Sequence, residues 1–179
     1  DFMNRATSHQ TFFFKDMSII GELSWKPIDC LNVFGKVSYD VNNTDNNDYL
    51  IYGMTEEFMR SCPDMMDMPI KELVPIIREA GMLFFQAHPF RNNMKIQKPE
   101  LLDGIEVYNG NGGEARNRNS EVLEEAKRRG CRMTSGSDAH APNNVGRGGL
   151  WLPADINNGY DMARYIAEHN SELERIETI

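Results

Sequence analysis

The stretch MLFFQAHP, residues 82–89, decides the fold class of this chain. Its first six residues are uncharged and almost all apolar, and they follow Gly81, which ends a helical pattern. A short apolar run bounded by glycine and proline is typical of a buried strand. His88 stands where this strand ends, and Pro89 biases the backbone of His88 toward an extended conformation.

Three other short runs are also predicted to be strands. GIEVY at residues 104–108 and CRMTS at residues 131–135 follow the first stretch, and YLIYG at residues 49–53 precedes it. The last of these ends at a glycine, as expected for a short buried strand that leads into a turn.

Helical patterns separate these strands. Residues 67–80 have one apolar face, and Pro75 lies inside the pattern, so we expect this helix to begin late or to kink. The next helix is predicted at residues 120–129 with Gly130 as its C-cap, and the last at residues 155–169. Strand alternating with helix implies parallel strands joined by helical crossovers, which is an α/β fold.

The composition excludes several classes of function. Nineteen Lys and Arg against 27 Asp and Glu give a formal net charge of −8. Nucleic acid and anionic membranes require a basic face, so neither partner is favoured, although local basic groups could still hold a small phosphate. The three cysteines show no CxxC spacing, which favours reduced thiols in a cytoplasmic protein. The apolar runs are far too short for a membrane span.

Polar residues gather where three predicted strands end. QAHPFR at residues 86–91 ends the first strand, Asn109 follows the second, and SGSDAH at residues 135–140 ends the third. Functional groups in parallel α/β folds lie at the carboxyl ends of the strands. We therefore expect these side chains to meet at one edge of the sheet.

His88, Asp138 and His140 are the candidate metal ligands in these clusters. Imidazole nitrogen and carboxylate oxygen suit zinc, manganese or iron. Asp138 and His140 are two residues apart, so in an extended segment both side chains point the same way. Each residue alone has an ordinary alternative, such as a surface histidine in a turn. Their joint occurrence after two separate strands favours a metal site.

Glu106 has two interpretations. It lies within the predicted strand between Ile105 and Val107. Its carboxylate either supports the metal ligands from behind, or simply faces solvent or pairs with a basic neighbour.

The order of these motifs resembles that of the PHP (polymerase and histidinol phosphatase) family. Four motifs carry the likeness: AHP at residues 87–89, DGIEVYN at residues 103–109, GSDAH at residues 136–140 and VGRGG at residues 145–149. The likeness covers residues 48–160. We expect a single PHP-like domain over residues 1–179, in which residues 1–47 are diverged or atypical.

The resemblance implies a distorted seven-stranded (β/α) barrel of parallel strands, here incomplete at the N-terminal side. It also implies one to three divalent ions (zinc, manganese or iron) and hydrolysis of a small phosphomonoester or nucleotide by metal-activated water. Arg91, Asn109 and Arg147 are the candidates for binding the phosphate. For both arginines an ordinary solvated side chain is the alternative.

The sequence also departs from the family pattern. The HxH and TDH-like motifs of the first two strands do not occur, and no glutamate stands near Gly35 where the family has one. A degenerate, non-catalytic PHP-fold domain with weak or no metal binding is therefore the alternative function. If the first strands are absent, either the N-terminal sixty residues cover the exposed sheet edges or the chain forms a homo-oligomer.

Overall fold

The computed structural model describes residues 47–65, 68–153, 155–156 and 158–177, together with the backbone of four two-residue strands before them. These strands form two antiparallel pairs: β1 (Phe13–Phe14) with β2 (Met17–Ser18), and β3 (Leu23–Ser24) with β4 (Asn32–Val33). The rest of residues 1–46, most of the region predicted to be atypical, lies outside the described residues.

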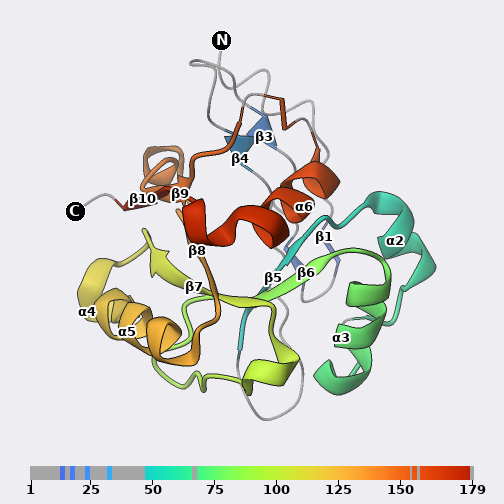
Figure 1. Ribbon diagram of the computed structural model, residues 1–179, viewed down its shortest axis with the longest axis horizontal. Helices are drawn as coiled ribbons and strands as arrows, with labels where there is room; N and C mark the ends of the chain where they lie inside the picture. Colours follow the sequence, from blue (N-terminus) through green and yellow to red (C-terminus); the bar gives the residue numbers. More distant parts are fainter. Residues whose placement is uncertain are drawn as a thin grey trace.

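A four-stranded sheet forms the centre of the described structure (Figure 1). Its strands, in spatial order, are β5 (Tyr49–Tyr52), β6 (Leu83–Gln86), β7 (Gly104–Asn109) and β8 (Arg132–Gly136). β6, β7 and β8 are parallel, which confirms the arrangement predicted for the three strands that carry the site motifs. The fold is mixed α/β, and the described strands form no closed barrel.

The strand β5 is antiparallel to β6, with Tyr49 opposite Gln86 and Tyr52 opposite Leu83. The prediction of parallel strands throughout is therefore wrong for β5. The chain leaves β5 and enters β6 at the same end of the sheet. A strand–helix–strand pattern in the sequence does not show whether the two strands are parallel or antiparallel. As a result, the beginning of β5 lies beside the end of β6, where the Ala87 amide donates to the Asp48 carbonyl oxygen at 2.9 Å.

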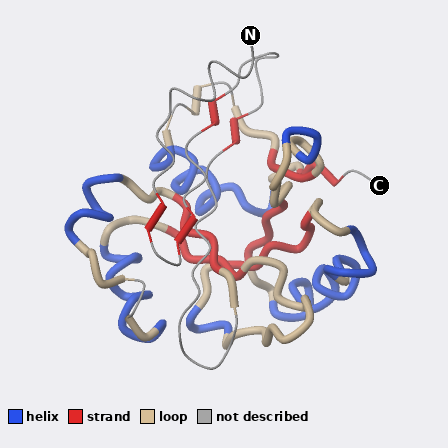
Figure 2. The backbone as a smooth tube through the Cα atoms, turned by 180° about the vertical axis from the view of Figure 1, so that it is seen from behind, coloured by secondary structure: helices blue, strands red, loops and turns tan. Residues whose placement is uncertain are grey.

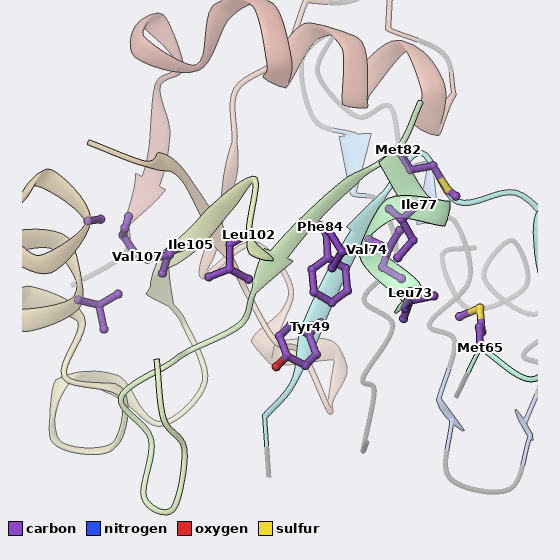
Figure 3. Close-up of a cluster of buried hydrophobic side chains, with 13 residues drawn as sticks. Tyr49, Met65, Leu73, Val74, Ile77, Met82, Phe84, Leu102, Ile105 and Val107 are labelled. Atoms are coloured by element: carbon purple, nitrogen blue, oxygen red, sulfur yellow. The ribbon is translucent and has the colours of Figure 1, made fainter. Parts of the chain in front are cut away.

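Helices cover both faces of the sheet (Figures 1 and 2). On one face, Phe84 of β6 packs with α3 (Ile70–Glu79) and α5 (Asn119–Arg129), in the core shown in Figure 3. On the other face, Phe85 packs against α6 (Gly159–His169). Adjacent strand residues point to opposite faces, so the apolar run of β6 supplies two cores at once.

The three predicted helices all form, and α3 and α6 begin later than predicted whereas α5 begins one residue earlier. α3 begins at Ile70 and continues past the exposed Pro75 to Glu79. α5 ends at Gly130, whose φ of +62° is the left-handed C-cap conformation that was predicted. α6 begins at Gly159 instead of residue 155, because the Asn158 side chain caps it by accepting from the Asp161 amide.

Shorter elements complete the described chain. They are α2 (Glu56–Ser61), η1 (Pro99–Leu101), α4 (Gly113–Asn117), η2 (Pro142–Asn144), η3 (Asn170–Glu172) and the antiparallel pair of β9 (Gly148–Leu150) and β10 (Arg175–Glu177). Among the described residues, no helix has both the length and the apolar character needed to cross a membrane.

Gly104 gives a test of how tightly β7 packs between its neighbours. A methyl group at this position would overlap the Phe85 ring and lie 2.6 Å from the Arg132 carbonyl oxygen. We predict that Gly104→Ala destabilises the protein by about 1–3 kcal/mol, the usual cost of overpacking, measured by thermal or urea unfolding. Gly149→Ala is the matched control, because there the added methyl meets only Ile176 at 3.6 Å. Equal stability of the two variants would contradict the packing described for β7.

Candidate metal site

Four chain segments meet at the carboxyl edge of β6, β7 and β8. Asp48 precedes the antiparallel β5, His88 follows β6, Asn109 ends β7, and Asp138 follows β8. Backbone hydrogen bonds join these segments, including one from the Gly110 amide to the Gly136 carbonyl oxygen at 2.8 Å. The predicted convergence of the strand ends is confirmed, with Asp48 as an additional member.

His88 lies at the centre of this cluster and is 1% exposed. Its Nε2 is 3.3 Å from Asp48 Oδ2 and 3.9 Å from Asp138 Oδ2. The other ring nitrogen, Nδ1, is 3.2 Å from the sulfur of Met94. The backbone of His88 has a φ of +26°, so the extended conformation expected from Pro89 is wrong. The bend turns the ring toward the two carboxylates.

Asp138 also adopts a left-handed backbone, with a φ of +47°. Its carboxylate is buried, and its Oδ2 accepts a hydrogen bond from Arg91 Nη2 at 2.6 Å. A non-glycine residue in this region of φ is uncommon and is retained where the surroundings hold it there. The extended segment expected from Asp138 to His140 therefore does not form.

His140 lies beside Asp138 but faces outward, with 68% of its side chain exposed. Its Nδ1 is 2.8 Å from the Asp138 carbonyl oxygen, 3.2 Å from Asn111 Nδ2 and 3.9 Å from Asp138 Oδ1. Within the parts of the chain that the structure describes, no three His, Cys, Asp or Glu are arranged to hold a metal ion. A metal shared by His88, Asp138 and His140 stays a prediction.

Glu106 is buried behind these residues and is 3% exposed. Its Oε2 accepts the His88 backbone amide at 3.0 Å and the Asn109 amide at 3.0 Å. A methyl group on Gly136 would come within 2.5 Å of its Oε1, so this carboxylate packs against the end of β8 as well. Burial raises the pKa of the nearby Tyr52 phenol well above its usual range; Thr134 opposes the shift and the Glu106 charge adds to it. Of the two interpretations of Glu106, the supporting role agrees with this geometry.

The three candidates for phosphate binding differ in their surroundings. Arg91 is largely buried, and it donates to Asn117 Oδ1, Asn109 Oδ1 and Asp138 Oδ2. Asn109 is buried as well, and both ends of its side-chain amide are engaged within the protein. Arg147 is exposed. It lies close to the end of β7, because a methyl group on Gly110 would come within 2.7 Å of its Cβ. Burial and the charge of Glu177 raise the pKa of Tyr108, and the charge of Arg147 lowers it.

Sequence reasoning missed Asp48, Met94 and Asn117 as parts of the site. Asp48 stands at the start of a strand, and only the antiparallel direction of β5 brings it to His88. Asn117, at the end of α4, is fully buried and bonds to Asn109 and Asn111. A buried asparagine beside a glycine-rich turn is a weak signal in sequence, because most asparagines there are exposed turn residues.

Comparisons with known proteins address only the second half of the chain. Residues 116–171 match a family model described as PHP-associated. This segment contains Asn117, Asp138 and His140, whereas His88 and Arg91 precede it. Neither the curated proteins nor the solved structures give a match. Over these residues the chain is similar to the PHP-associated family, and the earlier residues lie outside the match.

Proposed function

We propose that this protein is a metal-dependent phosphoesterase whose ion is held at the carboxyl edge of the sheet. The observation that carries the proposal is the position of His88 Nε2, 3.3 Å from the Asp48 carboxylate and 3.9 Å from the Asp138 carboxylate. One imidazole and two carboxylates from separate strand ends form a donor set suited to zinc, manganese or iron.

The contacts around His88 suit a metal ligand. When Nδ1 donates its hydrogen to the Met94 sulfur, Nε2 keeps the lone pair that a cation needs. The hydrogen bond from the His88 amide to Glu106 holds the backbone that carries this ring. His88, Asp48 and Asp138 would hold the ion, with His140 on the outer side as the remaining candidate.

When bound, a divalent ion polarises the phosphoryl group and lowers the pKa of its water toward neutrality. The exposed Arg147, close to the end of β7, has a planar fork of donors that suits phosphate oxygens. The substrate class we propose is a small phosphomonoester or nucleotide. His88, Asp48 and Asp138 are three donors, the number that one catalytic ion requires.

A non-catalytic PHP-fold domain is the second candidate function. Two observations favour it: Arg91 contacts Asp138 Oδ2 at 2.6 Å, and the Nδ1 of His140 faces a backbone carbonyl oxygen. A guanidinium on Oδ2 already neutralises this carboxylate within the protein, so the cluster is complete without an ion. Metal content per chain after purification separates the two functions.

Loss of the Asp138 charge tests the ligand assignment. We predict that Asp138→Asn weakens manganese or zinc binding at least about tenfold, because shape is kept while an anionic ligand becomes neutral. Isothermal titration calorimetry measures the affinity. Asp64→Asn, which changes an exposed aspartate, is the control and should bind as the unchanged protein does. Equal affinity of all three proteins would remove Asp138 from the site.

Catalysis is tested by hydrolysis of an aryl phosphate with added manganese or zinc. We expect slow, metal-stimulated turnover that His88→Ala reduces by about 100-fold or more, since the ring is the central donor. His169→Ala is the control, because this ring stacks on Tyr165 in α6. Turnover that is independent of metal, or that survives in His88→Ala, would contradict the proposed function. Absence of both metal binding and turnover would favour the non-catalytic domain.

A further inference from the structure

Arg91 connects all three parallel strand ends through its side chain. Its Nε donates to Asn117 Oδ1 at 2.7 Å, and its Nη2 lies 2.9 Å from Asn109 Oδ1, 3.2 Å from the Asn111 carbonyl oxygen and 2.6 Å from Asp138 Oδ2. These five residues are called the Arg91 network below. Arg91 itself follows β6, while its partners lie at the end of β7 or just after it, on α4, or after β8.

The central ion pair of the Arg91 network is buried. The side chain of Arg91 is 10% exposed and that of Asp138 is 1% exposed. Arginine stays charged under all ordinary conditions, so the Asp138 carboxylate has a permanent counter-ion in a fixed position. An ion pair removed from water in this way is held far more strictly than one on the surface, because separation would leave a buried charge.

The same network explains how the left-handed backbone of Asp138 is held. A φ of +47° is costly for a residue with a side chain and persists where the surroundings over-determine it. Arg91 anchors the Asp138 side chain from one side. Asn117 in turn fixes Arg91, because its Nδ2 donates to the carbonyl oxygens of Asn109 and Asn111 at 3.0 Å and 2.9 Å.

We propose that Arg91 is a positioning residue that holds Asp138 for metal binding, and not a residue that binds the substrate phosphate. The Nε–Nη2 edge of a guanidinium is a fork that can bind phosphate in bidentate fashion. In Arg91 this edge is occupied by Asn117, Asn109 and Asp138. The inference rests on the proposed function for the role of Asp138, but the network itself can be tested without metal.

The first experiment is hydrogen exchange of the protein in EDTA, comparing Arg91→Lys with the unchanged chain. Lysine keeps the charge but cannot reach Asn117 and Asp138 together in one plane. Exchange at the amides of Gly110 and Asn111, which donate to the Gly136 carbonyl oxygen and to Asn109 Oδ1, should rise about tenfold, because local opening becomes easier. Arg78→Lys is the matched control. Arg78 also links two segments, because its Nε donates to Asp103 Oδ1 and its Nη1 donates to the Glu100 carbonyl oxygen, but neither acceptor belongs to the Arg91 network.

The second experiment is calorimetric titration of the same proteins with manganese and zinc. Partners of metal ligands typically contribute 10- to 100-fold to metal affinity, so Arg91→Lys should bind metal about 10- to 100-fold more weakly, and Arg78→Lys should bind it normally. Asn117→Ala is the second variant, since it removes the support of Arg91 without touching Asp138. It should weaken metal binding in the same direction.

The two readouts separate the inference from the proposed function. Faster exchange in Arg91→Lys with no metal binding by the unchanged protein would retain the positioning role and reject the metal site. Metal binding that Arg91→Lys and Asn117→Ala leave unchanged or strengthen would overturn the positioning role and retain the metal site. Unchanged exchange in Arg91→Lys would also overturn it.

Discussion

The hydrogen bond from the His88 amide to the buried Glu106 carboxylate fixes the point at which β6 stops being a strand. From that point the chain bends into a positive φ, and the ring of His88 turns toward Asp48 and Asp138. The same carboxylate oxygen accepts the side-chain amide of Asn109, so the ends of β6 and β7 are held together. Replacing a carboxylate by an apolar side chain at this position would leave a backbone amide buried without an acceptor.

Much of the fold follows from short apolar runs that are bounded by glycine or proline. The strand at β6 and the C-cap at Gly130 were both readable, because apolar alternation and a helix-ending glycine depend on local chemistry. The direction of β5 was not readable. The side chains of β5 are apolar on both faces of the sheet. The direction of the strand depends on the end of the sheet at which the next strand begins, and the local sequence pattern does not specify that.

The convergence of polar side chains at the strand ends was predictable from the sequence, down to the residue types. His88 and Asp138 were expected to meet, and they lie within 3.9 Å of each other. The contacts of Arg91 and Asn109 were harder to predict, since an arginine after a strand looks the same in sequence whether it faces a substrate or a buried aspartate. The segment that matches the PHP-associated family model, residues 116–171, contributes Asp138 and Asn117, but His88 and Arg91 come from earlier in the chain. The site therefore depends on contacts between two parts of the sequence, which neither part encodes alone.

Because β5 is antiparallel to β6, the register of this strand pair determines where the Asp48 carboxylate lies relative to His88. Tyr49 and Ile51 belong to one core and Leu50 and Tyr52 to the other, so a slip of one residue against β6 would exchange the two sets of side chains. The same slip would turn the Asp48 side chain away from His88. The packing of these four residues therefore determines whether the Asp48 carboxylate lies beside His88. In a sheet with shifted register, one negative charge beside His88 would be absent.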